Sequence, residues 1–300
     1  MKPNDMYEGL TSVSGTPDRS IGDIIRQTNN LTPDQVEKIL GYQREHNLKF
    51  GEAAVALGFA KREDVLWALS QQFNYPYSPA GQRQTHEELV VANNPFSDQA
   101  EVFRDFRSQL ISQVFAKSSG SKAVAVVSVD VGDGKTFFAA NLAASFSQLG
   151  GRTLLIDADM RTPRQHEIFG INSGSAGLSG ILSGRTEPNV IRPVEELPSL
   201  YLLPVGVVPP NPLELVQRPT FGLLLNELSS KFDYIIVDTP AAVHGSDARV
   251  IAGACGTALA IGCKGTSRLA PMSKLIHDVR RASGSVLGVV MNEYVRGSKK

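Results

Sequence analysis

A glycine loop lies between an apolar run and a helix-forming run, and its residues could bind phosphate. Residues 124–143 read VAVVSVDVGDGKTFFAANLA. The backbone amides of such a loop can turn toward phosphate oxygens, Lys135 can reach the outer phosphates, and the Thr136 hydroxyl can ligate Mg²⁺. The common pattern G-x-x-x-x-G-K-[ST] requires a glycine five positions before Gly134, where this sequence has Val129. The loop is therefore either a degenerate phosphate loop or a variant of it.

Carboxylates follow two apolar runs farther along the chain. The stretch RTLLIDADMRTP carries Asp157, Asp159 and Arg161, and FDYIIVDTPAA carries Asp238. If both runs are neighbouring parallel strands, their carboxyl ends line one crevice beside the loop. Three carboxylates there can hold Mg²⁺ and orient a nucleophile. Each aspartate alone could equally cap the turn after its strand, but the full set beside the loop indicates a nucleotide site.

The elements that must position these residues alternate between strand and helix. We expect strands over 123–129, 153–157, 199–204, 233–238, 256–262 and 286–291. We expect helices over 99–116, 135–149, 212–230, 244–253 and 271–283. This alternation predicts an α/β fold with a doubly wound parallel sheet, covered by helices on both faces.

An internal repeat precedes this region. Residues 20–43 align with residues 49–72 at an offset of 29, and Gly22 then matches Gly51. Both units have apolar residues at helical spacing, and Thr32 followed by proline is typical of a helix start. The expected domains are a disordered tail over 1–16, a helical repeat domain over 17–79, a linker over 80–98, the phosphate-binding domain over 99–296 and a basic tail over 297–300.

The composition is that of a globular protein. Lys+Arg and Asp+Glu are equal at 30 each, so no overall field draws the chain to nucleic acid. The two cysteines form no CxxC pair, and no apolar run is long enough for a leader or a membrane span. These features predict a cytoplasmic chain that reaches the inner membrane through a partner. Residues 264–300 carry eight Lys or Arg against two acids, which fits a solvated basic tail or a docking patch for a membrane or an acidic partner.

The three motifs DVGDGKT, LLIDADMR and IIVDTP together resemble those of the bacterial tyrosine kinases (BY-kinases). In that family a phosphate loop without the first glycine is normal, which favours the interpretation of a variant loop. A second acidic motif of the family, Walker A′, has three apolar residues followed by D-x-D-x-R, and residues 154–161 fit it. The resemblance covers about residues 99–293.

This resemblance implies an autophosphorylating protein-tyrosine kinase that uses ATP and Mg²⁺. It implies that Asp157 is the base toward the tyrosine hydroxyl, although another aspartate could take that role. The implied catalytic residues are Lys135, Asp157, Asp159 and Arg161. The implied metal ligands are Thr136, Asp159 and Asp238. The implied ATP contacts are Gly132, Asp133, Gly134, Lys135, Thr136, Phe137 and Asn292, the last of which lies where related ATPases contact adenine.

Glu101, Arg104 and Arg107 form the pattern E-x-x-R-x-x-R, whose spacing places them along one face of a helix. In BY-kinases such a helix packs against the active site of a neighbouring subunit and builds a ring. An ordinary surface helix with an internal salt bridge would show the same spacing. The other family motifs favour self-association into a ring or a dimer.

The acceptor tyrosines depart from the family pattern. BY-kinases usually carry a tyrosine cluster at the C-terminus, where Tyr294 is the one candidate here, and Tyr75 and Tyr77 are alternatives upstream. Sparse acceptors favour a second hypothesis, a dimerising ATPase switch of the MinD/ParA type that hydrolyses ATP without phosphorylating tyrosine. The Walker A′ residue Arg161 disfavours it, as does Asp130, which replaces the signature lysine of that class.

The N-terminal repeat resembles the MshEN module of type II secretion and pilus ATPases, which binds cyclic di-GMP. The arginine expected at the head of each unit is Ser20 or Lys49 here, and Asn29 replaces a glycine. Serine cannot stack on guanine or chelate phosphate as a guanidinium does. Protein docking therefore competes with cyclic di-GMP binding as its role, and a third hypothesis is a cyclic di-GMP sensor with a purely structural ATP site.

The two regions together resemble the EpsG-type chain-length-determinant tyrosine kinases of exopolysaccharide export. This likeness implies a role in exopolysaccharide polymerisation and chain length. It also implies activation by a membrane-bound, Wzz-like chain-length regulator.

Overall fold

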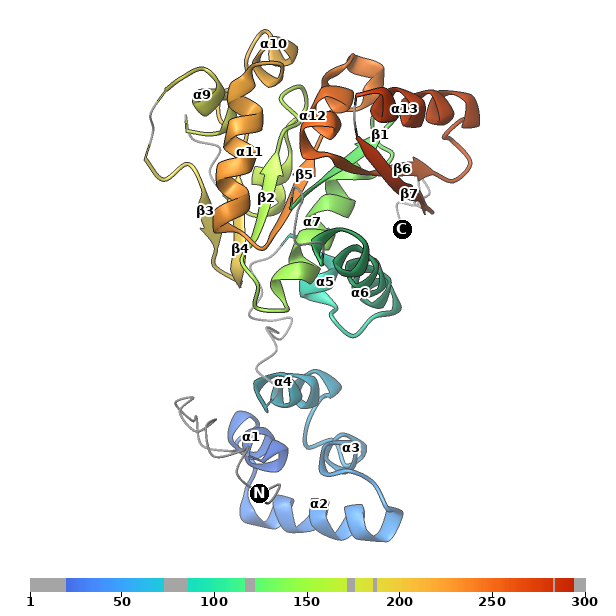
Figure 1. Ribbon diagram of the computed structural model, residues 1–300. Coiled ribbons are helices and arrows are strands. Elements are labelled where there is room, and N and C mark those ends of the chain that lie inside the picture. The colour runs from blue at the N-terminus through green and yellow to red at the C-terminus, as the bar shows by residue number, and fades with distance from the viewer. Residues whose placement is uncertain are drawn as a thin grey trace, which may run out of the picture. The chain divides into compact units, whose positions relative to one another are not determined.

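The computed structural model describes residues 20–72, 86–116, 122–171, 176–185, 188–282 and 284–293 (Figure 1). The chain divides into two compact units, Met1–Gln82 and Arg83–Lys300. The first unit has one apolar core and the second has one on each face of its sheet.

Four helices form the first unit: α1 (Ile21–Thr28), α2 (Pro33–His46), α3 (Phe50–Ala56) and α4 (Arg62–Gln72). Each half of the repeat thus supplies two helices, as the spacing predicts. At the start of α2, the Thr32 backbone N–H donates to Gln35 Oε1 at 2.9 Å, and the Gln35 N–H donates to Thr32 Oγ1 at 3.3 Å, which is a capping box. α1 packs against α4 and α2 against α3, which buries Ile25, Ile39 and Ala68 completely.

Seven strands form one sheet in the second unit: β1 (Ala123–Ser128), β2 (Thr153–Asp157), β3 (Arg192–Val194), β4 (Leu197–Leu203), β5 (Tyr234–Asp238), β6 (Thr257–Cys263) and β7 (Ser285–Asn292). The strand order is β3-β4-β2-β5-β1-β6-β7. All neighbours are parallel except β3 and β4. The predicted doubly wound parallel sheet is confirmed. The edge strand β3 was not predicted, because three residues are too few to show a period of two.

Helices cover both faces of the sheet (Figure 1). One face carries α5 (Val90–Asn93), α6 (Asp98–Leu110), the π-helical turn η2 (Ile111–Phe115), α7 (Lys135–Ser147) and α8 (Gln165–Ile168). The other face carries α9 (Leu178–Leu182), α10 (Pro212–Val216), α11 (Pro219–Lys231), the 3₁₀ turn η3 (Ala242–His244), α12 (Asp247–Cys255) and α13 (Leu269–Arg281). No helix in the described ranges is long and apolar enough to cross a membrane.

Residues 86–98 differ from the linker expected over 80–98. Leu89 and Val91 are buried in the core beneath α7. The Val91 N–H donates to Asn141 Oδ1 at 3.0 Å, and Asn141 Nδ2 donates to the Glu88 carbonyl at 2.8 Å. A buried polar side chain on α7 therefore satisfies the backbone of this segment. The turn-forming residues that suggest a linker instead mark short turns packed on the second unit.

Candidate active site

The phosphate loop follows β1 and ends at Lys135, the first residue of α7. Gly132 and Gly134 have φ angles of 87° and 98°, a region that favours glycine. Lys135 is only 5 % exposed and lies at a helix N-terminus, where the backbone dipoles favour an anion. Val129 buries its side chain in the core on the α12 face of the sheet. The residue in place of the usual first glycine thus has a packing role in an intact loop.

Asp133 and Asn292 hold the loop in place. The Asp133 carboxylate accepts hydrogen bonds from the Asp130 backbone N–H at 2.9 Å and from the Ser267 hydroxyl at 3.1 Å. Asn292 Nδ2 donates to the Asp133 carbonyl at 3.0 Å. A Cβ atom on Gly134 would lie 2.2 Å from Asn292 Nδ2. Both residues were expected to contact ATP; in the structure the Asp133 side chain and the Asn292 amide contact the protein, and Asn292 also lines the cavity described below.

Asp157 and Asp238 end the neighbouring strands β2 and β5 and are paired in register across them. Both side chains are completely buried. Asp157 accepts hydrogen bonds from the backbone N–H groups of Asp159 and Gln165, both at 3.1 Å. Burial and the adjacent Asp238 carboxylate raise the pKa of Asp157 well above its ordinary value. Burial also raises the pKa of Asp238 to about 6, although the charge of Lys135 opposes the rise.

Gln165 links these carboxylates to the phosphate loop. Its side-chain amide donates to Asp238 Oδ2 at 2.9 Å and to the Thr136 carbonyl at 3.1 Å. Gln165 is completely buried, and neither its Oε1 atom nor Asp238 Oδ1 has a hydrogen-bond partner among the described residues. Because buried acceptors usually have partners, these two oxygens indicate a place where a bound group supplies a donor or a positive charge.

Asp159 and Arg161 lie in the connection after β2. Asp159 accepts hydrogen bonds from the backbone N–H groups of Arg161 at 3.1 Å and Thr162 at 2.9 Å, and from the Thr162 hydroxyl at 3.0 Å. Arg161 Nη2 donates to both carboxylate oxygens of Asp247, at 3.0 and 3.2 Å. Asp247 is 2 % exposed and begins α12. Arg161, predicted to be catalytic, therefore braces this connection against α12.

A cavity of about 800 Å³ lies over the phosphate loop, within the size range of small-molecule sites. The predicted site residues that line it are Gly132, Gly134, Lys135, Thr136, Phe137, Asp159 and Asn292. Asp133, Asp157, Arg161 and Asp238 are not among the lining residues. The structure thus brings the loop, the second Walker A′ aspartate and the last strand together, with the two paired carboxylates buried nearby.

The oxygen donors fit a Mg²⁺ ion that is shared with phosphates. No three His, Cys, Asp or Glu side chains in the described ranges form a closed metal site. In nucleotide sites Mg²⁺ usually takes one or two carboxylates and completes its shell with water and phosphate oxygens. Thr136 and Asp159 line the cavity, and Asp238 has one oxygen without a partner among the described residues. These three residues suit such an open site.

The E-x-x-R-x-x-R residues lie on α6 and contact their own subunit. Glu101 forms a salt bridge with Arg104. Arg104 also donates to the Pro95 carbonyl, and Arg107 donates to the Ser145 carbonyl on α7. The Glu101 side chain is 71 % exposed, so it is the member of the pattern most accessible to another subunit. The candidate acceptors Tyr75, Tyr77 and Tyr294 lie outside the described residues.

Several residues of the site carry no sequence signal of their own. Gln165, Asp247 and Ser267 reach the loops only through the fold. Glu88 and Arg164 line the cavity and form a salt bridge, although Glu88 stands in the stretch expected to be a linker. Asp247 lies 86 positions after Arg161, and no spacing in the sequence indicates that the two side chains pair.

Comparison with known proteins agrees with this geometry. Residues 124–300 match the CobQ/CobB/MinD/ParA nucleotide binding domain. The putative tyrosine-protein kinase CapB of Staphylococcus aureus is 32 % identical over 71 % of this chain and 92 % of its own length. The tyrosine-protein kinase wzc of Salmonella typhimurium is 33 % identical over 71 % of this chain, which spans only 29 % of that longer protein.

Solved structures give the same result. The chimerical protein CapA2B2 has a TM-score of 0.63 at 31 % identity and covers 75 % of this chain and 96 % of its own. The kinase domain of the Escherichia coli tyrosine kinase ETK has a TM-score of 0.66 at 28 % identity, covering 73 % of this chain and 85 % of its own. MinD from Pyrococcus horikoshii, at 23 % identity and a TM-score of 0.51, shares the fold. The chain belongs to the CobQ/CobB/MinD/ParA nucleotide-binding family and, within it, to the bacterial tyrosine-protein kinases.

Proposed function

We propose that this chain is a protein-tyrosine kinase that uses Mg-ATP and phosphorylates copies of itself. The observation that carries this proposal is the cavity over the phosphate loop. It is lined by Lys135, Thr136 and Asp159 and lies beside the buried pair Asp157 and Asp238. The tyrosine-protein kinases among the relatives support the same reaction class.

Lys135 and the loop amides would bind the phosphates and stabilise charge on the transferred phosphoryl group. Mg²⁺, held by Thr136, Asp159 and Asp238, would neutralise charge on the phosphate oxygens. Asp157 would accept the proton of the acceptor hydroxyl, and the positive charge of Mg²⁺ at Asp238 would favour the ionised carboxylate that this role requires. Arg161 and Gln165 would orient the acidic residues rather than touch the substrate.

The decisive experiment incubates the whole purified chain with labelled Mg-ATP and measures phosphotyrosine and free phosphate separately. Lys135→Met is the control. Phosphotyrosine that requires Lys135 would support the kinase, and mass spectrometry would test Tyr294 as the acceptor. Free phosphate without phosphotyrosine, even with a membrane partner present, would reject the kinase and favour the ATPase switch of the MinD/ParA type.

We further propose that the kinase acts at the cytoplasmic side of the inner membrane in exopolysaccharide chain-length control, through a membrane-bound chain-length regulator. The resemblance of the whole chain to EpsG-type kinases supports this setting. Adding a cytoplasmic fragment of such a regulator should raise phosphotyrosine formation. An unchanged rate at saturating fragment would argue against activation by this partner.

Self-association would use the α6 face. Glu101 is the exposed member of the pattern, whereas Arg104 and Arg107 have contacts within the subunit. Glu101→Lys should therefore weaken assembly without disturbing the fold, as measured by light scattering and thermal unfolding. Asp105→Lys on the same helix is the matched control. If both variants assemble as the parent does, α6 is not part of the interface.

The N-terminal unit is proposed to dock a protein rather than cyclic di-GMP. The Ser20 hydroxyl donates to Asp23 and accepts from the Asp23 backbone N–H, so it is used to cap α1. The Lys49 backbone N–H similarly donates to Glu52 at 2.9 Å. The positions where the MshEN pattern has arginine are therefore helix caps here. Calorimetric titration of the whole chain with cyclic di-GMP should show no binding, and a saturable signal would revive the sensor hypothesis.

A further inference from the structure

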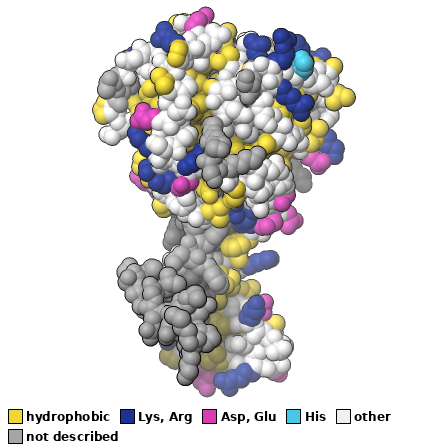
Figure 2. All heavy atoms as spheres, in the orientation of Figure 1, with side chains coloured by type: hydrophobic (Ala, Val, Ile, Leu, Met, Phe, Trp, Pro, Cys, Tyr) yellow, Lys and Arg dark blue, Asp and Glu magenta, His cyan; other side chains and the backbone are white. Residues whose placement is uncertain are grey.

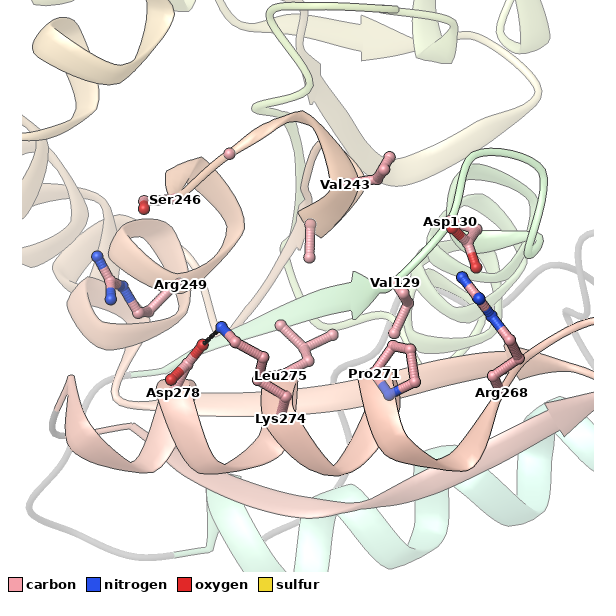
Figure 3. Close-up of a pocket in the computed structure, with 12 residues that line it drawn as sticks. Val129, Asp130, Val243, Ser246, Arg249, Arg268, Pro271, Lys274, Leu275 and Asp278 are labelled. Atoms are coloured by element: carbon pink, nitrogen blue, oxygen red, sulfur yellow. Dashed lines mark hydrogen bonds and ion pairs between the residues drawn. The ribbon is translucent and has the colours of Figure 1, made fainter.

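A second cavity, of about 460 Å³, also borders the phosphate loop (Figure 3). Val129 and Asp130 line this cavity, whereas Val131, Gly132 and Gly134 line the nucleotide cavity. Its other walls come from η3, the start of α12, and α13. We call it the α13 slot; its lining includes Asp130, Val243, Arg249, Arg268, Pro271 and Lys274.

Cations outnumber acids in the slot. Arg249, Arg268 and Lys274 face only Asp130 and Asp278. Lys274 Nζ donates to Asp278 Oδ2 at 2.7 Å, and Arg268 points toward Asp130 (Figure 3). Neither arginine side chain has a hydrogen bond or salt bridge to another residue in the described part of the chain. The charge of Arg249 acts on Asp278, but neither guanidinium donates a hydrogen bond within the described ranges, so both can donate to an anionic ligand.

The middle of the slot is apolar. Pro271 and Leu275 of α13 face Val129, and Val243 lies at the edge (Figure 3). Val243 is 62 % exposed despite its apolar side chain. A bare phosphate ion gains nothing from such a floor, whereas an aromatic ring gains buried contact area. The slot thus combines a surface for a ring with donors for an anion.

The surface around the slot is basic as well. Lys and Arg side chains gather over α12 and α13 (Figure 2). Arg280 and Arg281 are exposed in the last turn of α13. Clustered positive charge raises the local concentration of anionic ligands and speeds their association.

The slot is connected to the nucleotide site through hydrogen bonds of the loop. The Val243 N–H donates to the Val129 carbonyl at 3.0 Å. The Asp130 N–H donates to Asp133 Oδ2 at 2.9 Å, and the Asp133 carbonyl accepts from Asn292. A ligand that shifts Asp130 would therefore act on the loop that receives the nucleotide phosphates.

We propose that the α13 slot binds the phosphotyrosine side chain of a protein segment. The ring lies on Pro271 beside the exposed Val243, and the Arg249 guanidinium binds the phosphate. Phosphotyrosine matches both halves of the slot, because it carries an aromatic ring and a charge of about −1.5 to −2 at neutral pH. The inference rests on the proposed function, which makes phosphotyrosine the product of the neighbouring site. Bound product would then alter nucleotide affinity through Val243 and Pro271, which contact Val129 at the start of the phosphate loop.

The test uses the whole chain after phosphatase treatment and removal of the phosphatase. A fluorescent phosphotyrosyl peptide is titrated by anisotropy, with the unphosphorylated peptide, a phosphoseryl peptide, inorganic phosphate and phosphatidylglycerol vesicles as comparison probes. Arg249→Gln and Val243→Asp change the slot. Arg281→Gln removes the same charge from the exposed end of α13 and is the matched control. Thermal unfolding and nucleotide binding report whether each variant folds.

Arg249→Gln and Val243→Asp should each weaken binding of the phosphotyrosyl peptide at least tenfold, whereas Arg281→Gln should weaken it less than twofold. The phosphoseryl peptide should bind at least tenfold more weakly than the phosphotyrosyl peptide. Saturating phosphotyrosyl peptide should change nucleotide affinity in the parent and not in Arg249→Gln. Val243→Asp keeps the test valid if Arg249→Gln does not fold, because its side chain is exposed.

Three results would overturn the proposal. The first is no saturable binding of the phosphotyrosyl peptide. The second is equal binding of phosphate or the phosphoseryl peptide, which would show a general anion site. The third is that the chain binds vesicles through Arg249 but does not bind the phosphotyrosyl peptide. This result would show that the slot contacts a membrane. The kinase assay with Lys135→Met is separate: phosphotyrosine formation without peptide binding rejects only the slot, and peptide binding without phosphotyrosine formation rejects only the kinase.

Discussion

Asp157 lies directly opposite Asp238 on neighbouring strands, and both carboxylates are withdrawn from solvent. Burial and the Asp238 charge raise the pKa of Asp157, and burial and the Asp159 charge raise the pKa of Asp238. Lys135 and Gln165 offset part of this effect at Asp238. The site without nucleotide is therefore strained electrostatically, and a bound cation would relieve that strain.

Asp238 should lower the free energy of unfolding of the nucleotide-free chain by an amount that depends on pH. Its pKa is about 6 in the fold and 3.8 ordinarily, so between these values the folded chain keeps a proton that the unfolded chain has released. The free energy of unfolding therefore falls as the pH rises between these two pKa values. At lower pH both states are protonated, and Asp238 does not destabilise the fold. Urea unfolding in EDTA should show Asp238→Asn more stable than the parent at pH 7 and similar to it near pH 4.

Asp157→Asn should change stability with pH in the same direction as Asp238→Asn, because burial and the Asp238 charge raise the pKa of Asp157. A difference between parent and Asp238→Asn that stays constant from pH 4 to pH 7 would contradict the buried-pair explanation.

Gln165→Ala should damage both stability and activity. The change leaves Asp238 Oδ2 and the Thr136 carbonyl without their amide donor, and a buried group left unsatisfied costs about 1–3 kcal/mol. It should also raise the pKa of Asp238 further, because this hydrogen bond lowers it. Urea unfolding and the pH dependence of phosphotyrosine formation measure the two effects. Gln109→Ala, at an exposed position on α6, should change neither; equal effects of both substitutions would refute a positioning role for Gln165.

Gly134→Ala should abolish nucleotide binding. The added Cβ would lie 2.2 Å from Asn292 Nδ2, and the φ angle of 98° strains any residue other than glycine. The cost should exceed the roughly 1 kcal/mol gain that Gly→Ala gives at a compatible position. Gly222→Ala is the matched control, since a Cβ there meets nothing within 4 Å. Full nucleotide affinity in Gly134→Ala, measured by calorimetry, would show that the loop rearranges on binding.

Arg161 and Asp247 should show energetic coupling. Arg161→Ala leaves a carboxylate that is 2 % exposed without its partner. Breaking a buried pair from one side costs about 3–5 kcal/mol; because the Arg161 side chain is 30 % exposed, we expect about 1–3 kcal/mol here. A double-mutant cycle with Arg161→Ala and Asp247→Asn measures the coupling by urea unfolding. Additive effects of the two changes would mean that the pair does not brace the connection after β2.

The sequence predicted most of what local patterns control. The glycine loop, the acidic strand ends and the alternation of strands and helices each depend on neighbours within a few residues. Val129 could be interpreted as a variant only through the family resemblance, and the fold supplies the physical reason, because its side chain packs beneath α12.

What the sequence did not predict depends on contacts between distant segments. Gln165, Ser267 and Asp247 have no distinctive spacing, and their partners are chosen by the sheet order and the loops after β2, β5 and β6. The direction of the Arg161 side chain and the packing of residues 86–98 are tertiary outcomes of the same kind.

The contact between Asn292 and Asp133 joins residues 159 positions apart, and this separation bears on synthesis. The glycine loop is made early, but the side chain that holds it arrives with β7. In a nascent chain the loop therefore has its Asp130 and Ser267 contacts before it has its Asn292 contact, which forms when β7 pairs with β6. A chain that ends before Asn292 therefore lacks the hydrogen bond that fixes the Asp133 carbonyl.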